Sequence, residues 1–550
     1  MMIRKTLRLA ACLLFLPLVA PVFAQTAAGG NEDPVIRAMK TEMQRSKSRL
    51  KLAGMPVPYY IDYHIADMDR YEADATLGAL RTDLHTHMRM LRVVVRVGDY
   101  KQDSYFAMGE GASGPIPLED DDLALRTALW LATDQAYKNA TEALTAKQAQ
   151  LKQFTNDQPV DDFAHAEPVQ YLGPLAKLDF DAESWLGVLR AASALARRDS
   201  QIQASDASLD FQAVNRYFVN SEGAIIRTGQ TMYELTASGS TQAADGMHLQ
   251  RSNGYQVSSR NDLPSRDVFL AFTRKLLDTL ASLRQAPVVD EEYRGPVLMS
   301  GDAAASIFGD LIGGNALGIK PGLGNPARTQ GAFSGSYKSR VLPDFLSVVD
   351  DPTLTAYGGK SLVGHYDVDD EGVKALRVPI VVKGTLVNYL LGRAPIRDFP
   401  VSNGHGRARL PSLSPGPGLS NLLITTSAPL SAAELKQKLI DLCRERGLEY
   451  GYYAETLAQA HAPRLLYRIW VKDGHEELVR GAIFGDLDTR ALRSDVTAAG
   501  GEMYVDNHLQ GVPHSVVSPA ILFEELEVKR ANANKEKLPE YPPPALTAGR

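Results

Sequence analysis

The sequence SGDAAASIFGDLIGGNALG, residues 300–318, predicts a short helix that runs into several glycines. Either Ser300 or Asp302 can accept a hydrogen bond from the free N–H groups of the first helical turn. The apolar side chains recur at a spacing that places them on one buried helix face: Ile307, Phe308, Leu311 and Ile312. Gly309 lies within this helix, where a glycine destabilises the helix by about 1 kcal/mol relative to alanine. The helix therefore begins at a favourable capping residue and ends in glycines that destabilise it. This raises the question of what role positions Gly309, Asp310 and Gly314 have.

The segments that precede this helix predict an N-terminal α+β domain. Three runs read as strands, at 58–67, 72–84 and 87–100, and residues 207–259 read as meandering strands. Helical patterns separate or flank them at 33–53, 123–153, 182–200 and 265–285. Helices on one face of a mainly antiparallel sheet are the architecture that buries both kinds of element.

The segments that follow predict a second domain of a different kind. Residues 286–296 read as a linker, after which short strands alternate with turns rich in Gly, Pro and Asp. Short strands at this spacing favour a mostly β, barrel-like or sandwich-like domain. We predict four parts: a signal peptide (1–24), an N-terminal α+β domain (25–285), a C-terminal β-rich domain (286–530) and a disordered tail (531–550).

The first residues predict export. Arg4, Lys5 and Arg8 precede the apolar run LAACLLFLPLVAPVFA, which ends in small residues and predicts cleavage after Ala24. A lipoprotein signal at Cys12 is the weaker alternative, because most of the apolar run follows that cysteine. We therefore expect a periplasmic or secreted protein.

Charge and hydropathy exclude two classes of partner. Loss of three basic residues with the leader moves the formal net charge from −6 to −9, which disfavours nucleic-acid binding. No later segment reaches the ~18 uninterrupted apolar residues of a membrane span, so we expect none in the mature chain.

Four stretches carry a family resemblance. Residues 218–239 (FVNSEGAIIRTGQTMYELTASG), 291–318, 348–393 (with DDEG at 369–372) and 402–424 (SNGHGRARLPSLSPGPGLSNLLI) resemble, in the same order, blocks of the TldD/PmbA proteins. The resemblance implies a metallopeptidase scaffold whose zinc is held by a His-Glu-x-x-x-His motif on the helix at 300–318. It also implies a cysteine near the C-terminal end as the third ligand.

The zinc ligands of that family are absent from the matching positions. Gly309 stands at the first histidine, Asp310 at the glutamate and Gly314 at the second histidine, and residues 504–528 contain no cysteine. Side chains five apart lie about 140° apart on an ideal helix, so the family motif requires a locally distorted turn. The resemblance thus implies a non-metal, PmbA/TldE-like member: we predict no zinc and assign no catalytic residue.

Other histidines leave metal sites open as alternatives. His475-Glu476 begins like a zinc-protease motif, but no second histidine follows, and Asp473-Gly474 reads as a hairpin turn. His85 and His87 share one side of a strand, where a solvated sheet face is the simpler interpretation. The remaining alternative is a composite site built from four further histidines: His365, His405, His508 and His514.

The acidic pairs Asp350-Asp351 and Asp369-Asp370-Glu371 also have two interpretations. They could be paired acids of a non-metal hydrolase, or DDEG could shape a loop in which Gly372 takes the unusual backbone angles. From the matched blocks we select six candidates for a peptide-binding cleft: Asn315, Asp369, Asp370, Asn403, His405 and Arg407.

These observations lead to one hypothesis and two alternatives. We predict a non-catalytic subunit that binds peptides, held as an added strand, in a hetero-oligomer with an active TldD-like metallopeptidase. The alternatives are an active peptidase with a noncanonical metal or acid site, and a stand-alone module that binds peptides or surface polymers. The family's description as a modulator of DNA gyrase has no support in a chain with a leader and an acidic charge.

Overall fold

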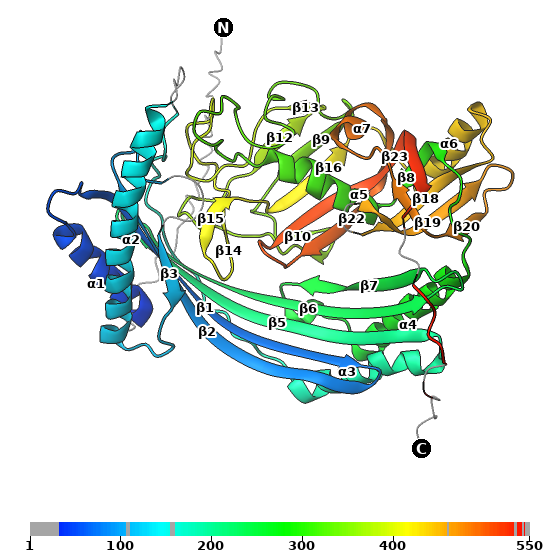
Figure 1. The fold of residues 1–550 in the computed structure, drawn as a ribbon, viewed down its shortest axis with the longest axis horizontal. Helices are drawn as coiled ribbons and strands as arrows, with labels where there is room; N and C mark the ends of the chain where they lie inside the picture. Colours follow the sequence, from blue (N-terminus) through cyan, green and yellow to red (C-terminus); the bar gives the residue numbers. More distant parts are fainter. Residues whose placement is uncertain are drawn as a thin grey trace, which may run out of the picture.

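The computed structural model describes residues 32–105, 111–153, 160–458, 461–532, 536–541 and 544. Two large sheets dominate it, and the second lies over the concave face of the first (Figure 1). The predicted leader, with Cys12 and the cleavage site after Ala24, lies outside the described residues, as does much of the predicted tail at 531–550. Export therefore stays a prediction.

The N-terminal sheet is built from very long antiparallel strands. Its strands follow the order β3-β2-β1-β5-β6-β4, and β7 also pairs with β6. The three predicted runs between 58 and 100 are only two strands, joined at Leu77-Gly78, where Gly78 has φ +86°. That prediction was wrong because the strand alternation continues to the turn on both sides. The strands are β1 (Pro58–Thr76), β2 (Ala79–Val97), β3 (Ala112–Pro115), β4 (Gln170–Leu172), β5 (Ile202–Asn220), β6 (Ile225–Gln242) and β7 (His248–Val257).

Four helices cover one face of this sheet, as the sequence predicted: α1 (Pro34–Arg49), α2 (Asp122–Leu151), α3 (Ala182–Ser193) and α4 (Arg266–Gln285) (Figure 1). Successive side chains of a strand point to opposite faces. Thus Ile61 and Tyr63 of β1 pack in the core under α1 and α2, whereas Ala66 and Met68 pack on the other face toward the C-terminal domain. One face of the sheet is thereby left to meet the second domain.

The C-terminal domain is a mixed sheet with parallel and antiparallel pairs, and it is open rather than a closed barrel. Its first strand begins at Tyr293, inside the segment read as a linker. The helices are α5 (Gly301–Phe308), α6 (Ala432–Glu445) and α7 (Thr489–Ser494). The main strands are β8 (Tyr293–Met299), β9 (Leu346–Asp350), β12 (Val378–Val382), β16 (Asn421–Thr426), β18 (Tyr450–Leu457), β19 (Pro463–Trp470), β20 (Glu476–Val479), β22 (Val496–His508) and β23 (His514–Arg530). The short strands are β10 (Ala356–Tyr357), β11 (Lys360–Ser361), β13 (Thr385–Leu386), β14 (Gly406–Arg409), β15 (Ser414–Pro417), β17 (Pro429–Leu430) and β21 (Ala482–Phe484).

Two hairpins of the C-terminal domain insert apolar side chains into the concave face of the N-terminal sheet. Leu413, from the β14–β15 hairpin, and Leu509, from the β22–β23 hairpin, share one core cluster with Ala66 and Met68 of β1. Both leucines are buried. The two domains are therefore held together in part by apolar packing.

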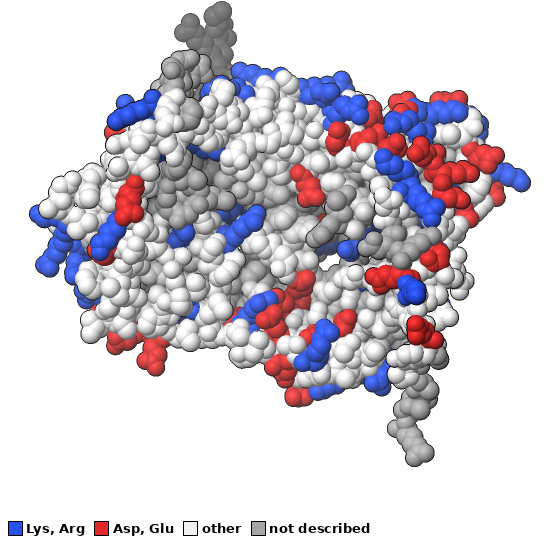
Figure 2. All heavy atoms as spheres, viewed as in Figure 1, with Lys and Arg blue, Asp and Glu red and all other residues white. Residues whose placement is uncertain are grey.

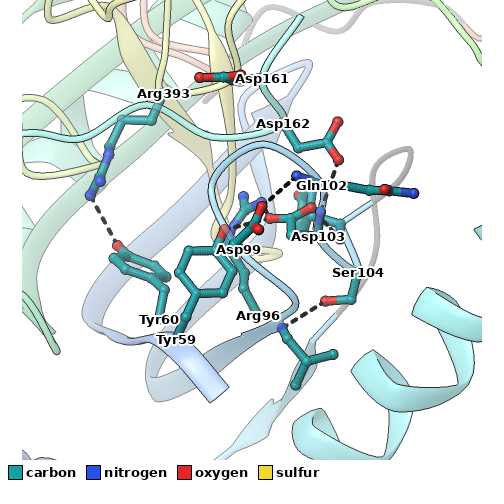
Figure 3. Close-up of polar contacts among 12 residues, drawn as sticks. Tyr59, Tyr60, Arg96, Asp99, Gln102, Asp103, Ser104, Asp161, Asp162 and Arg393 are labelled. Carbon is teal, nitrogen blue, oxygen red and sulfur yellow. Dashed lines mark hydrogen bonds and ion pairs between the residues drawn. The ribbon is translucent and has the colours of Figure 1, made fainter. Parts of the chain in front are cut away.

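Buried charged groups form a second type of contact between the domains, in addition to the apolar packing. The guanidinium of Arg393 is fully buried; it donates to the Glu222 carboxylate at 2.7 and 2.8 Å and to the Ala164 carbonyl at 2.6 Å. Figure 3 shows Arg393 reaching Tyr60, near the place where Arg96 meets Asp103 at 2.7 Å. An arginine of the C-terminal domain is thus embedded among groups of the N-terminal domain.

Across the part of the chain that the structure describes, no helix is both long and apolar enough to cross a membrane.

Candidate functional site

Helix α5 has the start and the buried face that its sequence predicted. The Ser300 hydroxyl accepts a hydrogen bond from the Ala303 N–H at 3.0 Å and donates one to the Glu455 carbonyl at 2.6 Å. Ile307, Phe308 and Ile312 are fully buried in the core of the C-terminal domain, and Leu311 is partly buried against it. The helix is therefore fixed on the sheet by its apolar stripe.

The chain then leaves the α-helical geometry at the glycines. Residues Gly309–Gly313 form a π turn and Gly314–Ala316 a 3-10 turn, and the Gly314 N–H donates to the Gly309 carbonyl. In a π turn, residues five apart are hydrogen-bonded neighbours. The local distortion expected for the five-residue spacing is thus present, although neither Gly309 nor Gly314 offers a side chain.

Space around the two glycines differs. A methyl group on Gly309 would lie 3.3 Å from Cγ2 of Val516, which is a tight contact. A methyl group on Gly314 would meet nothing nearer than the Gly309 carbonyl oxygen, at 4.0 Å. The site therefore has room for a side chain at Gly314.

Asp310 projects from the π turn into contact with a histidine. Its Oδ2 lies 3.2 Å from Nε2 of His461, and 70% of its side chain is exposed. The close contact with the His461 imidazole lowers the pKa of the Asp310 carboxyl. Asp310 is therefore an anion that solvent can reach, held by one imidazole.

Two further histidines lie close enough for their charge to act on this carboxylate. His508 and His514 are cross-strand partners at the ends of β22 and β23, and their rings stack 4.8 Å apart with 15° between the planes. His508 Nε2 lies 2.9 Å from the Asp506 carboxylate, and His514 Nδ1 lies 2.8 Å from the Val512 carbonyl. Positive charge on either imidazole ring lowers the pKa of the Asp310 carboxyl further.

The surroundings separate the pKa values of the two stacked rings. Burial by itself lowers the pKa of His508, but the hydrogen bond and charge of Asp506 outweigh it and raise the pKa above the ordinary value. Burial, and then the charge of His508, lower the pKa of His514. One ring therefore takes up a proton more readily than its neighbour.

The composite metal site considered for four histidines does not form. His365 Nδ1 lies 2.9 Å from the Pro352 carbonyl, and His405 Nε2 lies 3.1 Å from Asp350, so neither joins His508 and His514. Among the described residues, no three His, Cys, Asp or Glu side chains are placed to hold a metal ion. The residues present therefore do not fit the zinc centre that the family resemblance implies.

The other histidine candidates make local contacts. His85 and His87 are exposed on β2, where their Nε2 atoms lie 2.5 Å from Asp69 and 2.6 Å from Asp67. His475 follows the turn between β19 and β20 that Asp473-Gly474 predicted, and its Nδ1 lies 2.6 Å from Asp473.

Asp350 and Asp351, the first acidic pair, bind groups of the protein itself. Asp350 is fully buried; it accepts from the Ser420 N–H at 3.1 Å and contacts the Ser420 hydroxyl. Asp351 accepts from the N–H of Thr353 at 3.1 Å and from its hydroxyl at 2.6 Å. Both carboxylates brace the loops around them.

The DDEG segment supports the loop interpretation. Asp369 accepts from the N–H groups of Val373 and Gly406, each at 2.8 Å, and is itself buried. Burial and the nearby Glu371 raise its pKa well above the ordinary value. Gly372 has φ +84°, and a methyl group there would lie 2.8 Å from Phe218, so this turn needs glycine.

The remaining cleft candidates also bind backbone groups. Asn315 accepts from the Ala332 N–H at 2.7 Å, Asn403 accepts from the Leu391 N–H at 2.8 Å, and Asp370 accepts from the Ala408 N–H at 2.7 Å. Arg407 lies over the Tyr366 ring and donates to the Leu419 carbonyl at 3.2 Å. A role of these residues, or of Asp369 and His405, in peptide binding stays a prediction.

Sequence reasoning missed a groove between the two domains. A cavity of about 340 Å³ lies on the concave face of the N-terminal sheet and is bordered by the tip of the β22–β23 hairpin. Polar residues at alternate positions of β1, β5 and β6 were the signal that could have found it. Its polar lining residues are Glu72, Asp74, Thr82, Ser208, Asp210, Glu234, Thr236 and Gln510.

Charges in this groove are partly compensated. The Arg70 guanidinium pairs with Asp210 at 2.6 Å and with Glu72 at 2.8 Å, and Glu234 accepts from the Gln510 amide at 2.8 Å. Figure 2 shows basic and acidic side chains interspersed along the hollow between the two domains. The groove therefore offers hydrogen-bonding groups together with a modest negative charge.

Comparison with known proteins gives a family match and several structural matches. Residues 292–530 match the family model described as the PmbA/TldA metallopeptidase C-terminal domain. No protein of curated function matches the chain at a significant level.

Three solved structures share the fold. A candidate modulator of a DNA gyrase from Thermotoga maritima has 13% identity and a TM-score of 0.59, over 90% of this chain and 99% of its own. TldE from Thermococcus kodakarensis has 12% identity and a TM-score of 0.56, over 90% and 100%. A candidate DNA gyrase modulator from Bacteroides thetaiotaomicron has 13% identity and a TM-score of 0.58, over 90% and 98%.

Proposed function

Because the chain belongs to the TldD/PmbA family through its C-terminal domain, we propose that it is an exported, non-catalytic subunit that binds peptides together with an active metallopeptidase relative. The observation that carries this proposal is the π turn after α5. It retains the backbone arrangement that brings residues 309 and 314 together, but both residues are glycines. The surrounding core is complete, so the scaffold is preserved where the zinc ligands are not.

The groove between the domains is the place we assign to the peptide. Its volume of about 340 Å³ lies within the range of ligand-binding pockets. Backbone-like ligands need donors and acceptors along their length, which the Ser, Thr, Gln and carboxylate side chains of the groove supply. The fold shared with TldE from Thermococcus kodakarensis supports a TldE-like subunit, and the family resemblance implies its pairing with a TldD-type protein.

The test of the partnership is a pull-down from a periplasmic extract, followed by reconstitution with a His-Glu-x-x-x-His relative from the same compartment. We expect the isolated chain to carry no stoichiometric zinc and to hydrolyse no peptide, and the mixture to form a complex that does. Elemental analysis giving one zinc per isolated chain, lost on chelation together with melting temperature, would contradict the proposal.

Peptide binding is tested separately with groove variants. Thr236→Trp places bulk in the groove and should weaken binding of a fluorescent peptide at least tenfold, because it occupies the space that the peptide needs. Thr425→Trp is the matched control, since Thr425 is exposed on β16 outside the groove. Equal affinities for both variants would remove the groove from the proposal.

The contact between Asp310 and His461 favours a second candidate function, an active peptidase with an acid site. An exposed carboxylate beside an imidazole can move a proton to or from a substrate. Under this alternative the isolated chain cleaves peptides, and Asp310→Asn abolishes the cleavage. A monomer that binds peptides without cleavage and without a partner would instead favour a stand-alone binding module.

A further inference from the structure

The tip of the β22–β23 hairpin docks on the N-terminal sheet through a small number of defined contacts. The Leu509 side chain is buried against Ala66 and Met68, and its N–H donates to the Gln256 side chain at 2.6 Å. The Gln510 amide donates to Glu234 at 2.8 Å across the groove. The tip, residues 509–513, therefore borders the groove through Gln510.

His508 and His514 form the neck of this hairpin. They are the last paired residues before the tip, and their imidazole rings stack 4.8 Å apart. A stacked pair tolerates one proton, because the second ring can stay neutral. Two protons place like charges a few ångströms apart, which disfavours the pairing.

Charged groups around the neck favour unequal protonation of the two rings. On the His508 side, Asp506 lies 2.9 Å away on the same strand, and Asp302 of α5 and Asp310 of the π turn add negative charge. The His461 imidazole lies 3.2 Å from Asp310 and partly compensates the negative charge of that carboxylate.

The His514 ring meets a different set of groups. Asp350 of β9 favours a proton on this ring, whereas Arg407 of β14 and a charged His508 oppose one. The Val512 carbonyl holds Nδ1 at 2.8 Å. A proton therefore reaches His508 first and His514 only at lower pH.

We propose that His508 and His514 form an acid-sensitive latch, which releases the hairpin tip from the N-terminal sheet and opens the groove when both rings are protonated. Release of the tip goes beyond the proposed function and does not depend on it. Only the consequence for peptide access rests on that proposed function.

The sign of the effect follows from the two directions of pKa shift. His514 is held neutral in the docked hairpin, so the docked state loses stability as pH falls below the ordinary histidine value of about 6.5. Proton uptake by His508 at higher pH is favourable in the docked state, because Asp506 accepts its hydrogen bond. The first proton, on His508, therefore keeps the hairpin docked, and the latch opens only at the lower pH at which His514 is also protonated and the two charged stacked rings repel each other.

The test is hydrogen–deuterium exchange of the full chain without peptide, at pH 7.5 and pH 5.0, with each rate divided by its intrinsic value. The Leu509 amide, which bonds Gln256, and the Ser515 amide, which bonds the Ser420 carbonyl at 2.8 Å, report on the neck and tip. We expect their protection to fall at least tenfold at pH 5.0 in the parent protein and less than twofold in His514→Gln. Amides in the middle of β1 and β5 should not change in either.

His475→Gln is the matched control, because that histidine is exposed on another hairpin, where it contacts Asp473 and stacks on Trp470. It should follow the parent protein. If His514→Gln folds poorly, as judged by its circular dichroism, His508→Gln gives the same reading. The latch would be overturned if amide protection at pH 5.0 fell equally in the parent and in the histidine-neck variant, or did not fall in the parent. Loss of peptide binding alone would not affect the latch.

Discussion

At the level of a single residue, Gly314 is a glycine that its own backbone does not require. Its φ is −61° and its ψ −33°, which any residue adopts, and a methyl group there meets open space. Gly314→Ala is therefore expected to stabilise the protein by about 0.4–1 kcal/mol, mainly by restricting the unfolded chain. The measurement is the free energy of unfolding in urea.

Gly309→Ala is the comparison for this prediction. A methyl group at Gly309 lies 3.3 Å from Val516, so the entropic gain is offset by crowding, and the gain should be smaller or reversed. Destabilisation by Gly314→Ala instead would mean that the open space beside the π turn is filled in solution.

At the level of secondary-structure elements, Asp162 ties helix α2 to the loop after α5. Its carboxylate lies 2.6 Å from Lys147 of α2 and 2.7 Å from Lys320. Figure 3 places Asp162 next to Asp103, whose N–H donates to Asp162 at 2.9 Å. Removing the Asp162 charge from this largely buried network costs roughly 3 kcal/mol, since both lysines lose their nearest carboxylate. We therefore expect Asp162→Asn to destabilise the protein by about that amount at pH 7.

The pH dependence gives this prediction its sharper form. Burial raises the pKa of Asp162, but the charges of Lys320 and Lys147 outweigh it and leave the pKa below the ordinary value. The stabilisation is thus present above the ordinary aspartate pKa of about 3.9 and is lost as pH falls through the lowered value. Unfolding curves of parent and Asp162→Asn should converge in acid, whereas Asp473→Asn, on an exposed hairpin, should match the parent at every pH.

For the molecule as a unit, Arg393 is a fully buried charge of the C-terminal domain that pairs with Glu222 of the N-terminal domain. Arg393→Met leaves Glu222 without its guanidinium partner, and we expect a loss of about 3–5 kcal/mol in unfolding free energy. Arg294→Met is the control: Arg294 is 55% exposed beside Asp486, and its loss should leave the unfolding midpoint unchanged. Equal effects of the two variants would show that the Arg393–Glu222 pair does not hold the domains together.

Much of the secondary structure could be predicted from the sequence by itself, because it depends on local patterns of residues. The stripe of α5, the long helix α2 and the turn at Gly372 depend on periodicity or on one residue's backbone preference, so each could be predicted without knowing its neighbours. The N-terminal sheet was predicted for the same reason. Its hairpin turn at Leu77-Gly78 was missed, because strand alternation does not mark where a strand reverses.

Tertiary structure alone decided the candidate site. Asp310 meets His461, and Leu509 reaches Met68, across separations in the chain that no local pattern encodes. Likewise, the polar residues of β1, β5 and β6 line a groove only because strand register turns one face of the sheet toward the β22–β23 hairpin. Sequence thus determined the elements and the glycines at positions 309 and 314, and long-range pairing determined which side chains surround those glycines.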